Sequence, residues 1–360
     1  MKNRNIAPML KVIIAAALFG ASAPLSKLLL SEIAPTLMAS FLYLGSGIGL
    51  YVQRFVQRYF RSLDNRFSDE ARLTRNDLPW ITGAVLVGGI AAPIVLMFGL
   101  KNTPASTASL LLNFEGVATA VIAVVAFKEA VGKRIWLAVL LITTASILLS
   151  WDSSRQWGFS LGAIGILGAC VLWGIDNNFT RNVSSKDPLS IVTIKGLSAG
   201  TFSLILSVVL GFQLPPFKFV LVAMVLGYFS YGLSIVLFIR AMRELGAART
   251  STLFGTAPFV GAVLSLFLFK ESQGTLFYFS LPIMIIGAIF LLKEDHSHLH
   301  KHEKIEHEHR HNHRDLHHTH CHVGDDIPKG GYHSHDHEHE FMIHEHQHAP
   351  DICHRHAHLS

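Results

Sequence analysis

The sequence predicts an all-α integral membrane protein of ten transmembrane helices, followed by a separate polar tail. Half of its 360 residues are hydrophobic and only 15% are charged. All 22 histidines lie between His296 and His358, where no apolar stretch is long enough to cross a membrane. Residues 1–293 and 294–360 are therefore two different kinds of chain.

Ten apolar segments fill the first part of the chain. Each is close to the ~20 residues that a helix needs to cross a hydrocarbon core ~30 Å thick. The first resembles a secretory signal, but it has a counterpart in the second half of the chain, so we keep it as a helix. The predicted helices run at about 9–30, 34–57, 79–100, 104–127, 133–150, 158–179, 188–212, 217–239, 246–269 and 274–292.

The loops between these segments differ strongly in charge. With the N-terminus inside, sixteen Lys and Arg residues fall in inner loops and four in outer loops, namely Lys101, Arg155, Lys218 and Lys270. Cytoplasmic loops hold the excess of Lys and Arg, so we predict a multi-pass protein of the cell inner membrane with both termini cytoplasmic. Residues 1–293 carry +12 and residues 294–360 carry −7 with His neutral. Because the positive excess belongs to membrane loops, we expect no nucleic-acid partner.

An internal repeat divides the apolar part. Ala105–Glu129 aligns with Ala247–Glu271 at a constant offset, and both segments end in Phe-Lys-Glu. An odd number of helices per repeat makes the second copy enter the membrane from the opposite side, as in many secondary transporters, whose solute site lies near the midplane. We therefore predict two inverted five-helix repeats, at 1–150 and 151–293, and a disordered tail at 294–360. Similar composition of Gly- and Ala-rich helices is the alternative explanation.

Two short motifs carry a family resemblance. The pairs Phe19-Gly20 and Trp173-Gly174, together with the two Phe-Lys-Glu ends, resemble the EamA family of the drug/metabolite transporter superfamily over residues 9–292. The resemblance implies a ten-helix permease that exports amino acids, metabolites or drugs by alternating access, and it leaves the substrate open. The family often has Arg-Phe in the second helix of each half. Here those places read Leu42-Tyr43 and Lys195-Gly196, so any role of that arginine transfers only to Lys195.

Ionisable side chains inside apolar segments are the candidates for the transport pathway, because each costs about 2.5–3.5 kcal/mol to insert. Glu115 has no counterpart in the second repeat, so we expect it to serve the solute or a coupling proton; an ion pair with Lys195 is the alternative. The run Asp176-Asn177-Asn178 suits a cation or a polar solute, and a polar helix end at the interface is its alternative. The predicted pathway residues are Glu115, Asn113, Asp176, Asn177 and Lys195.

Other polar features have simpler interpretations. Lys27 and Arg181 lie near helix ends, where snorkelling to the interface explains them. No Walker, Rossmann or Ser/His/Asp arrangement can be assembled from the sequence. We therefore predict a transporter rather than an enzyme, with no catalytic residues.

Histidine recurs at every second residue in six clusters of the tail. In an extended chain this spacing puts the imidazoles on one side, and neutral imidazole suits Ni²⁺, Co²⁺, Cu²⁺ and Zn²⁺. An engineered affinity tag is the alternative, but such tags are short and contiguous. The predicted ligands of a divalent transition metal are His296, His298, His300, His302, His307, His309, His311, His313, His318, His320, Cys321, His322, His333, His335, His337, His339, His344, His346, His348, Cys353, His354, His356 and His358.

These observations lead to one main hypothesis and two alternatives. The main hypothesis is an efflux permease whose tail collects nickel or cobalt and delivers it to a proton-coupled pathway, with no cofactor required for transport. The first alternative is an exporter of an organic metabolite or amino acid, in which the tail is only regulatory. The second is a membrane-tethered metal buffer or sensor. Expected partners are the lipid bilayer and a small solute or metal ion; a homodimer is left open.

Overall fold

The computed structural model describes residues 6–61, 73–127, 132–151, 159–183, 186–245, 250, 253–270, 273–292, 297–302, 305–312, 332–339 and 342–347. Up to residue 292 the described chain is helical, with an isolated bridge between Trp151 and Phe159. The helices are α1 Ile6–Gly20, α2 Ser22–Leu29, α3 Pro35–Arg61, η1 Arg75–Asp77, α4 Leu78–Ala84, η2 Val85–Ala91, α5 Ala92–Lys101, α6 Ala105–Leu111, α7 Phe114–Phe127, α8 Lys133–Ser150, α9 Leu161–Arg181, α10 Pro188–Val209, α11 Phe217–Gly227, η3 Tyr228–Leu233, α12 Ser234–Leu245, α14 Ala257–Phe269 and α15 Thr275–Leu292.

Eight helical stretches of the described chain are long and apolar enough to cross a membrane, and the shorter apolar helices α14 and α15 follow them. This confirms the prediction of a multi-pass helical membrane protein. The count of ten crossings stays a prediction. The eight stretches are Ala7–Leu29, Pro35–Gln57, Arg75–Lys101, Ala105–Ala126, Lys133–Ser150, Leu161–Arg181, Pro188–Val209 and Phe217–Ala241.

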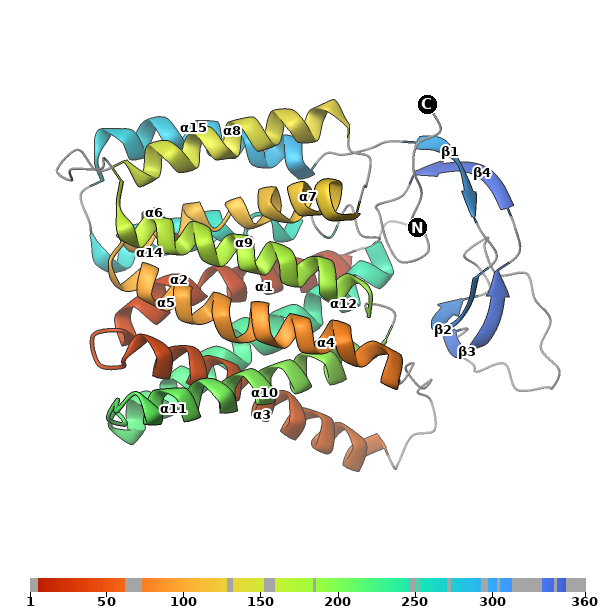
Figure 1. The fold of residues 1–360 in the computed structure, drawn as a ribbon, viewed down its shortest axis with the longest axis horizontal. Coiled ribbons are helices and arrows are strands. Elements are labelled where there is room, and N and C mark those ends of the chain that lie inside the picture. The colour runs from red at the N-terminus through yellow and green to blue at the C-terminus, as the bar shows by residue number, and fades with distance from the viewer. Residues whose placement is uncertain are drawn as a thin grey trace.

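The helices of the two halves pack mainly against each other rather than within each half (Figure 1). Helix α3 lies along α10, and α8 lies along α15. Helix α9, from the second half, contacts α5 and α7 of the first, while α1 of the first contacts α12 and α14 of the second. Polar residues on α9 and α10 are thereby brought against the first half of the chain.

Glycine allows these helices to approach closely. A Cβ atom on Gly47 of α3 would lie 2.6 Å from the nitrogen of Leu197, and one on Gly196 of α10 would lie 2.7 Å from the nitrogen of Gly47. Both neighbours are backbone atoms, which cannot move aside as a flexible side chain can. Close backbone approach through small residues is how membrane helices gain packing energy where lipid is as apolar as they are.

The two aromatic-Gly pairs have the same packing role. A Cβ on Gly20 would lie 2.2 Å from the Ala257 oxygen on α14, and one on Gly174 would lie 2.9 Å from Ala118 on α7. Each glycine thus lets the first helix of one half touch the fourth helix of the other half. The motif that carries the family resemblance is a packing device.

Two helices widen into π turns partway along their length. These turns are η2, between α4 and α5, and η3, between α11 and α12. At the offset that aligns Ala105 with Ala247, the two π segments overlap. Segment η2 contacts α9 and α10, whereas η3 contacts α1 and α3. Such bulges occur frequently at functional sites.

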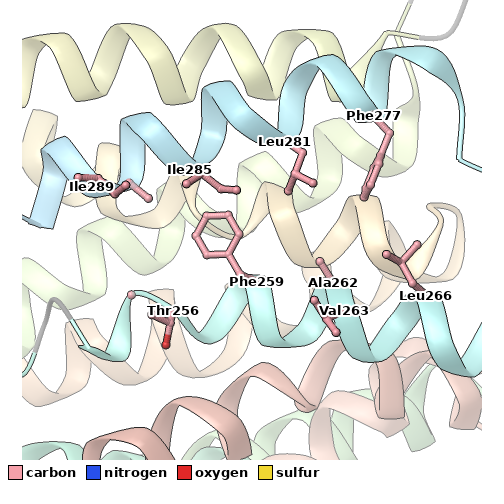
Figure 2. A pocket seen from close by; sticks show the side chains of 11 residues that line it. Thr256, Phe259, Ala262, Val263, Leu266, Phe277, Leu281, Ile285 and Ile289 are labelled. Atoms are coloured by element: carbon pink, nitrogen blue, oxygen red, sulfur yellow. The ribbon is translucent and has the colours of Figure 1, made fainter.

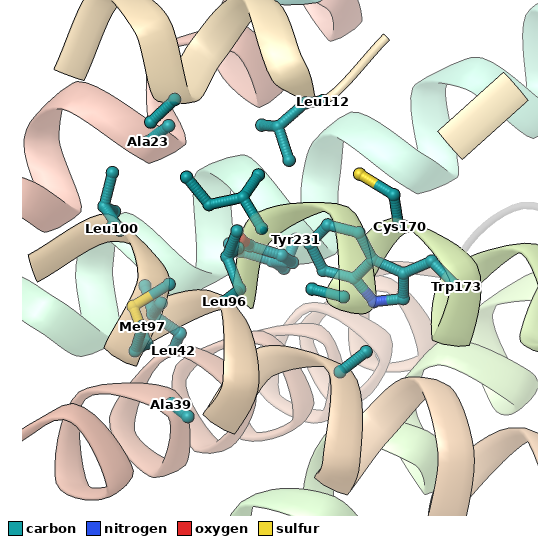
Figure 3. Close-up of a cluster of buried hydrophobic side chains, with 14 of the residues drawn as sticks. Ala23, Ala39, Leu42, Leu96, Met97, Leu100, Leu112, Cys170, Trp173 and Tyr231 are labelled. Carbon is teal, nitrogen blue, oxygen red and sulfur yellow. The ribbon is translucent and has the colours of Figure 1, made fainter. Parts of the chain in front are cut away.

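The main cluster of buried apolar side chains joins both halves of the chain (Figure 3). It includes the aromatic rings of Trp173 on α9 and Tyr231 in η3. Among the residues drawn around them are Leu42, Leu96, Met97, Leu100, Leu112 and Cys170. One continuous core therefore supports the polar groups described below.

The structure describes four short stretches of the tail, and disorder of residues 294–360 as a whole stays a prediction. These stretches form four strands, β1 Ser297–His302, β2 Ile305–Asn312, β3 Tyr332–His339 and β4 Met342–Gln347. Strand β1 pairs with β4, and β2 pairs with β3, both antiparallel (Figure 1). Low apolar content argued only against a buried core. The same every-second-residue pattern is also the period of a strand, which can pair through its backbone.

Replacing Gly47 with Ala is expected to lower the free energy of unfolding in detergent by about 1–3 kcal/mol, because the new methyl group meets backbone across the α3–α10 contact. Chemical denaturation followed by tryptophan fluorescence measures this change. The matched control is Gly168→Ala on α9, where the added Cβ has one ordinary contact at 3.8 Å. Equal stability of the two variants would contradict the close contact.

Candidate functional site

A buried salt bridge joins Asp176 on α9 to Lys195 on α10. The side chain of Asp176 is 5% exposed and that of Lys195 is 18% exposed. The second carboxylate oxygen of Asp176 accepts a hydrogen bond from the Thr180 hydroxyl at 3.1 Å. Neither charge is well solvated here, so each is stabilised mainly by the other.

Glu115 has a different partner from the Lys195 that the sequence offered as an alternative. Its Oε1 accepts a hydrogen bond from Nδ2 of Asn177 at 2.8 Å, and the same amide donates to the Thr119 hydroxyl at 3.1 Å. Lys195 is paired with Asp176 instead. Glu115 nevertheless lies close enough to both charges of the salt bridge to interact with them electrostatically.

The helix that carries Glu115 is interrupted. Helix α6 ends at Leu111, a turn covers Leu112 and Asn113, and α7 begins at Phe114. Glu115 therefore lies in the first turn of α7, where the helix dipole favours a negative charge. The Asn113 side chain is buried and donates to the Leu110 carbonyl at 3.0 Å. Its amide nitrogen therefore satisfies a carbonyl group at the break between α6 and α7.

The polar run after Trp173 is divided between two environments. Asp176 and Asn178 are buried, and Asn178 donates to the Gly174 carbonyl at 2.8 Å and to the Thr119 carbonyl at 3.2 Å. Asn177 is exposed and holds Glu115. The run is therefore part of the α7–α9 contact and not simply a polar helix end at the membrane interface.

The carbonyl of Gly88, in the π turn η2, is the meeting point of two aromatic donors. It accepts hydrogen bonds from the Tyr43 hydroxyl at 2.9 Å and from Nε1 of Trp173 at 3.1 Å. A Cβ on Gly88 would lie 2.0 Å from Oδ2 of Asp176, so any side chain here would displace the salt bridge. The ring of Tyr231 lies 5.7 Å from that of Tyr43 and closes this side of the site.

The site also contains four residues that were not among the predicted pathway residues: Tyr43, Gly88, Thr119 and Tyr231. A signal existed for Tyr43, because it occupies the second-helix place where the resembling family often has Arg-Phe. The other three are common residues of membrane helices. Their roles depend on which helices face each other.

Lys27 has a structural role at a helix end. Its ammonium group donates to the carbonyls of Leu100, at 3.1 Å, and Thr103, at the C-terminal end of α5. A positive charge there satisfies free carbonyls and complements the helix dipole. This contact accounts for Lys27 without snorkelling to the interface.

Metal-ligating groups do not converge in the described part of the protein. No group of three His, Cys, Asp or Glu side chains placed to hold a metal is found there. In the tail, twelve of the predicted ligands lie at described strand positions. The remaining predicted ligands lie outside the described residues: His296, His313, His318, His320, Cys321, His322, His348, Cys353, His354, His356 and His358.

An apolar pocket of about 480 Å³ lies between α14 and α15 (Figure 2). Its lining is almost entirely aliphatic and aromatic, with Thr256 as the one hydroxyl side chain among the lining residues. Val263 and Ile285, which line it, are exposed on the helix surface. In a membrane this pocket adjoins the lipid tails and offers a polar solute almost no partners.

Known proteins resemble this chain over its whole helical part. It matches the EamA-like transporter family at residues 7–151 and 160–293. It is 26% identical over 297 residues to an uncharacterized transporter of Methanothermobacter thermautotrophicus, covering 80% of this chain and 87% of that protein. An uncharacterized transporter of Clostridium kluyveri is 26% identical over 233 residues, covering 61% and 73%.

The fold has also been observed in a crystal structure. That chain aligns with a TM-score of 0.57 at 14% identity, covering 79% of this chain and 96% of the other. At this identity the likeness concerns the fold alone.

Neutralising one member of the salt bridge, by Asp176→Asn or Lys195→Gln, is expected to lower the free energy of unfolding by about 3–5 kcal/mol, because the other charge is left buried without a partner. The double variant is expected to be more stable than either single variant. A double-mutant cycle in detergent measures the coupling. Lys101→Gln, at an exposed helix end, is the control. If the stability losses of the two single variants simply added in the double variant, Asp176 and Lys195 would not stabilise each other.

Proposed function

Because the chain belongs to the EamA-like transporter family, we propose that it is a secondary transporter that exports a small polar organic solute bearing both a positive and a negative charge. The observation that carries this proposal is the buried salt bridge between Asp176 and Lys195. We further propose that its tail binds a divalent transition metal on the cytoplasmic side of the cell inner membrane.

The paired halves support an inverted-repeat transporter of ten helices. Contacts between the halves occur in matched sets, since α9 meets α5 and α7 while α1 meets α12 and α14. The π segments η2 and η3 overlap at the repeat offset. In such transporters the solute site lies between the repeats and is built from broken helices, and α7 begins after a break beside this site.

A zwitterionic solute suits this site because it can exchange partners with the salt bridge one for one. Its carboxylate would take Lys195 and its ammonium group would take Asp176, and no buried charge would be left unpaired. A solute with a single charge would strand either Asp176 or Lys195. The site therefore favours amino-acid-like compounds over simple anions or cations.

Glu115 is our candidate for the coupling proton. It is partly exposed, its neighbour Asn177 is exposed, and it interacts with the salt bridge electrostatically. Asn177 donates to its carboxylate, and the Asn177 side-chain oxygen is an acceptor if the amide turns over. Asn177 can therefore hydrogen-bond to Glu115 whether its carboxyl group is ionised or protonated. Protonation of Glu115 would then depend on whether the Asp176–Lys195 salt bridge is intact.

Metal export is the second candidate function, favoured by the 22 histidines of the tail. Asp176 is already neutralised by Lys195, however, and the Asn113 amide is committed to its own helix. A bare cation therefore has Glu115 as its main acidic partner along this path. This is why we place the metal on the tail and an organic solute in the bundle.

Transport into inside-out membrane vesicles tests the proposal. Radiolabelled amino acids and Ni²⁺ are supplied separately, with and without a pH gradient. We expect gradient-driven uptake of at least one amino acid, retained when residues 294–360 are removed. Asp176→Asn and Lys195→Gln should each lower it at least about tenfold, as expected for a loss of ~1.4 kcal/mol or more of solute stabilisation. Glu115→Gln should abolish the effect of the gradient.

The vesicle assay separates the alternatives. Uptake of Ni²⁺ alone, lost on truncation of the tail, would favour metal export. A membrane-tethered metal store predicts a different set of results. No solute would be taken up, and the metal tolerance of cells would be unaffected by Glu115→Gln and Asp176→Asn but lost when the tail is deleted. Lys101→Gln should behave as the unmodified protein. Labelling of single cysteines at both ends checks that the termini share the cytoplasmic side.

A further inference from the structure

The register of the tail strands places histidine opposite histidine. In the antiparallel pair β1–β4, His298 is directly opposite His346, and His300 is directly opposite His344. In the pair β2–β3 the opposed positions are His307 with His337, His309 with His335, and His311 with His333. Five directly opposed His–His positions therefore occur in twenty-eight described residues of strand.

Both pairs of strands follow one register. The residue numbers of each opposed pair add to the same total in β1–β4 and in β2–β3. The outer pair thus encloses the inner pair in the order of a single long hairpin. The opposed histidines are 22 to 48 residues apart along the chain, and their spacing matches this common register, which local composition alone does not require.

Histidine also shares one face within each pair. Side chains alternate between the faces of a strand, so residues two apart lie on the same face, and directly opposed residues share it too. The β2–β3 pair therefore assigns His307, His309 and His311, with their three opposed partners, to one face. The β1–β4 pair assigns its two opposed His pairs to one face in the same way.

We propose that each strand pair is a metal-binding His ladder, in which one transition-metal ion takes imidazoles from both strands. Opposed positions have Cβ atoms ~4.5–5.5 Å apart, and successive positions on one face are about 7 Å apart along a strand. Two opposed pairs therefore place four histidine positions at the corners of a rectangle of about 5 by 7 Å, and in this proposal a metal ion, whose nitrogen ligands bind at about 2.0–2.1 Å, draws their side chains together. This inference rests on the proposed metal binding by the tail and names its site.

Charge on the other face of the β2–β3 pair favours a ladder that depends on metal. Glu306 is opposite Glu338, and Glu308 is opposite Asp336. Directly opposed like charges destabilise a strand pair. A cation bound by the histidine face supplies the compensating charge and cross-links the strands, so metal binding and strand pairing stabilise each other.

The competing explanation is that each metal is held within one strand by residues two apart. A composition-preserving exchange separates the two. Exchanging neighbours in β3, as H333S/S334H, H335D/D336H and H337E/E338H, keeps the number of histidines and the two-residue spacing of the three that oppose His in β2, but moves these three to the opposite face; His339, which is opposite Ile305, stays in place. A second variant adds the matching exchange in β2, as E306H/H307E, E308H/H309E and R310H/H311R, which restores opposed histidines.

The full-length protein in detergent is titrated with Ni²⁺ by calorimetry. We expect the β3 exchange to weaken the tightest sites at least about tenfold, through loss of the second strand's chelating groups. The β2 and β3 exchanges together should restore binding. An exchange of two neighbours that moves no predicted ligand, D326I/I327D, is the control and should leave Ni²⁺ binding unchanged.

Each outcome has one meaning. Unchanged Ni²⁺ binding after deletion of residues 294–360 would overturn metal binding by the tail itself. Binding lost on deletion but unaffected by the β3 exchange would overturn the cross-strand ladder and leave chelation within single strands. Loss in the β3 variant without recovery in the combined variant would also overturn the ladder, because the register would not be the cause.

Discussion

Lipid cannot solvate a charge, and this constraint organises the centre of the protein. Asp176 and Lys195 are tolerated inside the bundle because each lies against the other. Glu115 is held by an amide and lies at the start of a helix. The polar groups of the site thereby form one connected arrangement in which moving one charge changes the balance of the others. A transporter can use such coupling, because a solute enters by replacing a partner.

Close packing between the halves makes this arrangement possible. The salt bridge lies where α9 and α10 meet η2, and the absence of a side chain at Gly88 leaves room for the carboxylate. The π turn leaves the Gly88 carbonyl free to accept from two aromatic side chains. Packing through glycine and a widened helix turn thus serve the same purpose. Together they place the Gly88 carbonyl and the Asp176 carboxylate close to each other in the buried part of the bundle.

The tail is stabilised by different interactions from those of the helical bundle. Its sequence is polar and offers little apolar surface to bury, so pairing of its described strands depends mainly on the backbone. Strands whose acidic positions oppose each other gain little from pairing alone. In the function proposed above, the tail responds to metal and the bundle responds to solute and proton. Under that proposal, joining the two in one chain would allow metal to influence the membrane protein without entering its pathway.

Local patterns of the sequence determined the class of the protein, its helical segments and the candidate charges, because apolar length and an ionisable residue within it are visible over about twenty positions. Glu115, Asp176 and Lys195 were identified in this way. Their partners were decided by the tertiary structure, which pairs Lys195 with Asp176 and adds Tyr43 and Gly88 to the site. The tail likewise showed its histidine period in sequence, but only the register placed His298 opposite His346. The physical reason is the same in both cases: which groups meet depends on contacts between distant segments, and no local pattern encodes these contacts.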